Sequence, residues 1–129
     1  MKPFIPHENM ILLKRWANSI SAYLHCPVYL VGSSLNKKDY RDVDVIAVIT
    51  DWHFTLRFNG TWKEWQDEGI TGEYTEIRWC WARECSKQWH SGAGETGLNL
   101  DFKILAAGVV ENDSRPVFRL DSNPYTRID

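Results

Sequence analysis

Two short apolar runs, separated by a polar connection, constrain the fold of this chain more than any other feature. The runs are Val28–Val31 and Val43–Ile49, and both are rich in β-branched residues. Because each run is short for a helix, we expect two buried strands. The first run leads into Gly32 and Ser33. We expect a turn there, where the first strand ends.

Two acids, Asp42 and Asp44, lie at the start of the second expected strand. Residues i and i+2 of a strand point to the same face, so we expect the two carboxylates to lie side by side. Like charges on one face raise at least one pKa unless a cation lies between them. Carboxylate oxygen is the ligand that Mg²⁺ prefers. The pattern therefore predicts a divalent metal ion at this position.

A third acid lies on a later alternating stretch, Leu98–Ile104. The alternation predicts a strand whose apolar residues share one face while Asp101 points to the other. In isolation, an acid at such a position faces solvent or pairs with Lys103. If this strand lies beside Val43–Ile49, however, Asp101 approaches the first two acids.

Gly32-Ser33, eight intervening residues and Asp42-Val43-Asp44, followed by Asp101 between apolar residues, resemble the signature of the DNA polymerase β-like nucleotidyltransferase superfamily. The resemblance runs from Val28 to Ile104 and is to small, single-domain members. It implies an α/β (α+β) fold, with a small mixed β-sheet flanked by helices. It also implies Mg²⁺-dependent transfer of a nucleoside monophosphate from a nucleoside triphosphate (NTP) to an acceptor hydroxyl, with release of pyrophosphate.

The same resemblance assigns roles to individual residues. Asp42, Asp44 and Asp101 are the implied catalytic residues and the implied ligands of two Mg²⁺ ions. The implied nucleotide-binding residues all lie on the connection between the first two strands: Gly32, Ser33, Ser34, Lys37 and Arg41. A glycine lets the backbone approach a phosphate, and cations neutralise its charge. Taken alone, the same residues also fit an ordinary turn with a serine cap and solvated surface charges.

The remaining stretches suggest elements that surround this core. His7–His25 and Glu73–His90 carry apolar residues at spacings of three and four, which predicts two amphipathic helices, the first ended by Pro27. Gly92–Gly97 matches a G-x-G-x-x-G pattern, but it follows a helix and leads into a strand, so we interpret it as a loop. The aromatic residues of Trp52–Trp65 either pack over the sheet or stack on a nucleobase.

Composition limits the classes of protein to consider. The 129 residues are expected to form one domain, residues 1–129. A net charge of -2 disfavours a dedicated nucleic-acid binder. Cys26, Cys80 and Cys85 lack the C-x-x-C spacing of a zinc site and are expected to be reduced core thiols. With no long apolar run and no signal peptide, the sequence predicts a soluble cytoplasmic protein without a membrane partner.

The acceptor and the partners stay open at this point. A small molecule, a protein or an RNA end would all supply a hydroxyl, and a homodimer or a partner protein would help to hold it. Two other functions fit the same residues. One is a non-catalytic nucleotide-binding or protein-interaction module, like an antitoxin. The other is an antibiotic nucleotidyltransferase of the aminoglycoside or lincosamide type, which should show an acidic cleft.

Overall fold

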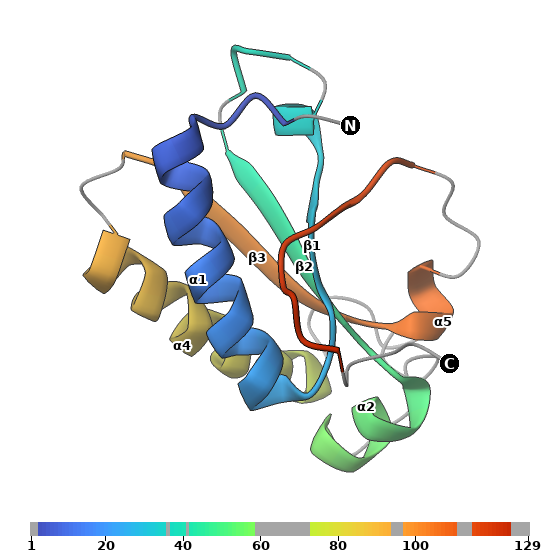
Figure 1. The fold of residues 1–129 in the computed structure, drawn as a ribbon. Coiled ribbons are helices and arrows are strands. Elements are labelled where there is room, and N and C mark those ends of the chain that lie inside the picture. The colour runs from blue at the N-terminus through green and yellow to red at the C-terminus, as the bar shows by residue number, and fades with distance from the viewer. Residues whose placement is uncertain are drawn as a thin grey trace.

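The structure is a computed structural model that describes residues 3–35, 37–40, 42–58, 73–93, 97–110 and 115–124. Within these ranges, four strands form one mixed sheet in the order β3-β2-β1-β4. Figure 1 labels β1, β2 and β3 of this sheet. Strand β1 (Val28–Val31) pairs antiparallel with β2 (Val43–Ile49) and with β4 (Phe118–Arg119). Strand β2 pairs parallel with β3 (Leu100–Ala106). The expected mixed sheet with flanking helices is confirmed.

Helices α1 (His7–Leu24) and α4 (Glu73–Ala93) cover one face of this sheet (Figure 1). Alternate strand residues supply the sheet's share of the core, because successive side chains of a strand point to opposite faces. These core residues are Val28, Leu30, Val43, Val45, Ala47, Ile49, Leu100, Phe102, Ile104 and Ala106. The opposite face is left to carry the polar chemistry.

Trp16 of α1 joins the two helices to the sheet. Its ring meets Trp89 of α4 edge-on at 6.2 Å and Phe102 of β3 edge-on at 5.2 Å between centroids. Its Nε1–H donates a hydrogen bond of 2.9 Å to the carbonyl of Cys85. The indole thus buries its apolar body and satisfies its one donor, a combination that fixes its orientation.

Short elements connect these parts. Helix α1 ends at His25, which has a left-handed φ of 54° and precedes Pro27 by two residues. A 3-10 turn η1 (Ser33–Leu35) follows β1, helix α2 (Asp51–Phe58) follows β2, and helix α5 (Ala107–Val110) follows β3. The carboxylate of Asp51 accepts a hydrogen bond of 2.8 Å from the Gly108 N–H. This bond ties the start of α2 to α5.

The buried carboxylate of Asp121 anchors the C-terminal part of the described chain. It accepts hydrogen bonds from the Val28 N–H at 2.8 Å, from Ser21 Oγ at 3.2 Å and from Arg119 at 3.0 Å. Burial alone would raise the pKa of Asp121, but the bonds from Arg119 and Val28 outweigh it, and the pKa lies below its ordinary value. The network holds the end of β4 against β1 and α1.

The observed boundaries confirm some expectations and correct others. Strands β1 and β2 have the expected bounds, and α1 ends one residue before His25. The expected strand Leu98–Ile104 begins and ends two residues later, at Leu100 and Ala106. Helix α4 continues beyond His90 through Ala93, so the loop interpretation of Gly92–Gly97 is wrong at its first two residues. Residues 94–96 lie outside the described ranges.

The cysteines are free, and only two of them occupy the core. Cys26 and Cys85 are buried, and burial raises the pKa of their thiols to about 12 and about 11. The expected core position is wrong for Cys80, which is exposed because it lies off the stripe that buries Cys85 and Trp89. None of the helices in the described ranges is long and apolar enough to cross a membrane.

Candidate functional site

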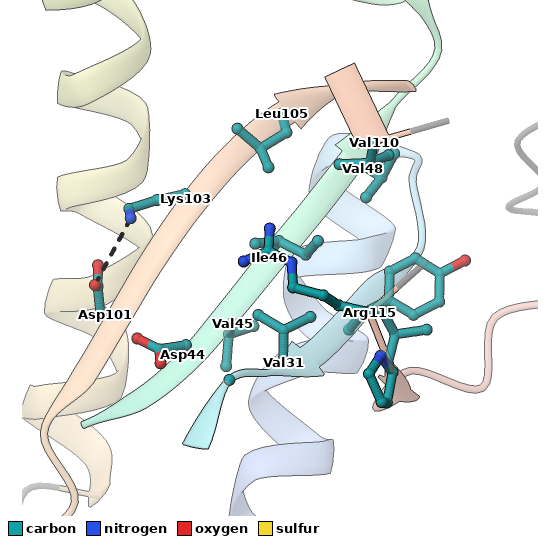
Figure 2. A pocket seen from close by; sticks show the side chains of 14 residues that line it. Val31, Asp44, Val45, Ile46, Val48, Asp101, Lys103, Leu105, Val110 and Arg115 are labelled. Atoms are coloured by element: carbon teal, nitrogen blue, oxygen red, sulfur yellow. Dashed lines mark ion pairs between the residues drawn. The ribbon is translucent and has the colours of Figure 1, made fainter. Parts of the chain in front are cut away.

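The sheet face opposite α1 and α4 forms the floor of a groove of about 640 Å³ (Figure 2). Strand pairing places its side chains in three rows across the sheet. The first row is Val31, Asp44 and Asp101, the second is Tyr29, Ile46 and Lys103, and the third is Val48 and Leu105. Val110 of α5 and the segment Arg115–Val117 add further lining. The groove is thus acidic at one end and aliphatic at the other.

Asp44 and Asp101 are direct neighbours on the parallel strands β2 and β3. This confirms the expected pairing of the two strands, and Figure 2 shows both carboxylates at the same end of the groove. Burial raises the pKa of Asp44, and the charges of Asp101 and Asp42 raise it further. The charge of Lys103 lowers this pKa but does not offset the other effects, so the ionised form of Asp44 is only partly compensated. A bound cation would complete that compensation.

Gly32 is required here for a reason that the sequence did not reveal. It directly follows β1 and lies beside Asp44, and its φ of +82° is a left-handed conformation. A Cβ atom at this position would overlap the Oδ2 atom of Asp44 and lie 3.1 Å from its Cβ and Cγ. The missing side chain of Gly32 thus makes room for the Asp44 carboxylate.

The substitution Gly32→Ala is expected to cost about 1–2 kcal/mol of folding stability, because an alanine is strained in the left-handed region. It should also displace the Asp44 carboxylate and weaken any binding of a divalent metal ion at Asp44 and Asp101. Gly97→Ala is the matched control, since Gly97 has a φ of +74° and no atom lies within 4 Å of the place that an added methyl group would take. Denaturant titration and Mg²⁺ calorimetry on both variants separate the two effects. Equal Mg²⁺ affinity in both would contradict this account.

Asp42 occupies a different position from the other two acids. It precedes β2, and its Oδ1 accepts a hydrogen bond of 2.7 Å from Asn99 Nδ2. It does not line the groove, although its charge contributes to the raised pKa of Asp44. Among the described residues, no group of three His, Cys, Asp or Glu side chains is arranged to hold a metal ion. The acid pair is therefore Asp44 and Asp101, with Asp42 nearby and engaged by Asn99.

Lys103 also lines the groove, a position that its sequence neighbourhood did not by itself predict. Its Nζ lies 4.0 Å from Asp101 Oδ2, and 67 % of its side chain is exposed. The dashed line in Figure 2 marks this ion pair. The sequence does contain a feature that predicts the face on which it lies. Lys103 follows Asp101 by two residues, so both side chains point to the same face of β3.

The implied phosphate-binding residues are distributed unevenly. Gly32 lines the groove, whereas Ser33, Ser34 and Lys37 do not. Ser33 is half-buried, Lys37 is exposed and Ser34 is fully buried. Among the described residues, Ser34 Oγ has no hydrogen-bond partner. Arg41 lies outside the described ranges. Among the described members of this set, Gly32 lies beside Asp44, and Ser33 follows it at the start of η1.

The aromatic stretch Trp52–Trp65 is described only in part. Its first part forms helix α2, on which Trp52 is 67 % exposed and Phe54 is buried. Phe54 therefore packs in the core, as the interpretation that these aromatic residues pack over the sheet requires. Trp62 and Trp65 lie outside the described ranges, so the base-stacking interpretation stays a prediction for them.

The donor set fits a divalent metal ion at the acid pair. Two carboxylates from adjacent strands offer hard oxygen ligands, and burial together with the neighbouring acids raises the pKa of Asp44. Asp44 and Asp101 are the residues that would hold the ion, and Asp42 is near enough for its charge to act on Asp44. A scan of family models, a search of curated proteins and a search of solved structures each found no match to this chain.

Proposed function

We propose that this protein is a Mg²⁺-dependent nucleotidyltransferase of the DNA polymerase β-like type, which moves a nucleoside monophosphate from an NTP to an acceptor hydroxyl. One observation carries the proposal: Asp44 and Asp101 are paired in register on β2 and β3, directly beside the positive-φ turn at Gly32. The mixed α/β sheet is compatible with this type of fold. Acid pair and turn occupy one end of a groove that has room for a substrate.

Each residue would have a distinct task in this reaction. The backbone at Gly32 and Ser33 would approach the triphosphate, and Asp44 would hold a divalent ion together with Asp101. Bound Mg²⁺ supplies charge neutralisation at the α-phosphate and at the leaving pyrophosphate. Asp101 would accept the proton of the acceptor hydroxyl, whose oxygen attacks the α-phosphorus while the bond to pyrophosphate breaks. Asn99 would hold Asp42 in place behind the pair.

The first experiment is a thermal-shift titration of the protein with ATP, GTP, CTP and UTP, with and without Mg²⁺. A ligand that binds only the folded state at 100 times its dissociation constant adds about 2.7 kcal/mol of stability. We expect at least one nucleotide to raise the melting temperature in a Mg²⁺-dependent way. We expect Asp101→Asn to remove this shift, because it takes one charge from the acid pair.

Glu84→Gln is the matched control, since it removes one negative charge from an exposed position on α4. Its nucleotide response should equal that of the wild type. If no nucleotide binds, a protein-interaction module without catalysis becomes the better interpretation. If nucleotides shift the wild type and the Asp101→Asn variant alike, the assignment of the site is wrong.

A further inference from the structure

We propose that the aliphatic end of the groove is the acceptor subsite, and that the acceptor is an anionic hydroxyl compound with an apolar body. The inference rests on the proposed function, because it assigns a substrate class to the same site. Three features carry it: the direction of the groove, the residues of its floor and the position of Lys103.

The direction of the groove places the acceptor opposite the triphosphate. Strands β1 and β2 are antiparallel, so the Gly32 end of β1 meets the Asp44 end of β2. The groove then runs away from Gly32 along β2, past Ile46 to Val48. In an in-line displacement the attacking and leaving oxygens lie on opposite sides of the phosphorus. With pyrophosphate on the Gly32 side, the attacking hydroxyl comes from the aliphatic end.

The floor of that end is apolar. Val48 is buried, Ile46 and Leu105 are half-buried, and Val110 of α5 closes the end (Figure 2). Rows of side chains on one face repeat every two residues, which is about 7 Å along a strand. A hydroxyl at the acid row would therefore leave space for a flat body of two fused rings or a short acyl chain. Such a body gains free energy by leaving water.

The charges along the groove favour an anionic acceptor over a cationic one. Beyond the acid pair, the charged residues in the described lining are Lys103 and Arg115. Lys103 lies one row from Asp101, and its ammonium group now pairs with that acid at 4.0 Å. Once a metal ion neutralises the acid pair, the ammonium group is available to a carboxylate or phosphate on the acceptor. A polycationic aminoglycoside lacks such a group and would meet Lys103 with like charge.

The transfer step needs no reactant other than the NTP and the acceptor. The acceptor oxygen forms a bond to the α-phosphorus of the NTP, and the bond between that phosphorus and the bridging oxygen breaks. Pyrophosphate leaves with the electron pair, and the hydroxyl proton passes to the Asp101 carboxylate. Lys103 is a specificity-determining residue in this scheme, since it contacts the acceptor away from the reacting atoms.

A fluorescence titration tests the inference with two probes, a hydroxynaphthoate whose hydroxyl and carboxylate groups lie on opposite rings, and uncharged naphthol. In Mg²⁺ buffer, we expect the full chain to bind hydroxynaphthoate roughly fivefold more tightly than naphthol, as one partly exposed ion pair allows. Lys103→Met should remove this preference. Leu105→Gln should weaken both probes roughly fivefold, because it makes the floor polar.

Two matched variants control for general effects. Leu56→Gln makes the same change on α2, where Leu56 is 63 % exposed, and Lys87→Met removes an exposed lysine from α4. Neither should alter probe binding or the Mg²⁺-nucleotide thermal shift. If the wild type binds a nucleotide but Lys103→Met and Leu105→Gln do not change probe binding, the proposed acceptor class is wrong and the proposed function stands. Probe binding without any nucleotide binding would overturn the transfer function and, with it, the acceptor role.

Discussion

Asp44→Asn is expected to abolish nucleotide transfer and yet to make the metal-free protein more stable. The loss of transfer, at least roughly a hundredfold, follows from removing a preorganised charge at the reacting centre. The gain in stability follows from the raised pKa of Asp44, which burial and the charges of Asp101 and Asp42 produce. An acid with a raised folded pKa favours folding at low pH, and this contribution is lost as pH rises through that pKa. At neutral pH the ionised carboxylate thus opposes folding.

Two measurements on the wild type and Asp44→Asn separate these effects. Pyrophosphate release reports transfer, and melting curves without metal report stability from acidic to neutral pH. We expect the substitution to raise the melting temperature at neutral pH and to lose this advantage below the ordinary aspartate value of 3.8. Glu84→Gln should change neither quantity. A destabilised Asp44→Asn variant would mean that the Asp44 carboxylate is compensated in the metal-free protein.

The strands at the site were predictable because their residues are locally unambiguous. The β-branched runs at Val28–Val31 and Val43–Ile49 match β1 and β2 at both ends. The predicted third strand, Leu98–Ile104, begins two residues before β3. The alternation of apolar residues starts at Leu98, whereas pairing with β2 starts at Leu100. Leu98 keeps the apolar pattern, but it lies outside the ladder, and its carbonyl instead accepts a hydrogen bond of 3.3 Å from Trp89 Nε1.

The position of Asp42 could not be derived from strand periodicity. The rule that residues i and i+2 share a face holds only where both belong to a strand. The ladder of β2 begins at Val43, so the pleat does not orient Asp42. Its carboxylate bonds instead to Asn99, a residue distant in the sequence. Such a long-range partner leaves no trace in the local pattern.

The groove could not be predicted from the sequence either, because its walls come from segments that are far apart in the chain. The floor follows from the alternation of β2 and β3, which the sequence shows. The walls depend on α5 and on Arg115–Val117, and the place of the latter depends on the anchoring of the following strand through Asp121. The sequence around Asp121 carries no motif that indicates burial. Its role is visible only when Val28 and Ser21 are seen to donate to it.

Asp121→Ala should therefore be strongly destabilising, at about 3 kcal/mol. The substitution leaves the Val28 N–H and Ser21 Oγ without their charged partner and releases Arg119. Because the folded pKa of Asp121 is lowered, its contribution is present above the unfolded pKa and lost as pH falls through the folded value. Wild-type stability should thus decline below about pH 4, with a smaller decline in the variant.

Urea denaturation from neutral to acidic pH measures both expectations, with Asp39→Ala as the control at an exposed position. Hydroxynaphthoate titration of Asp121→Ala adds a test of the groove. The C-terminal segment supplies one wall of the groove, so loss of the anchor should weaken probe binding while leaving the Asp44–Asp101 pairing of β2 and β3 intact. A variant as stable as Asp39→Ala would show that the Asp121 network does not hold β4 in place.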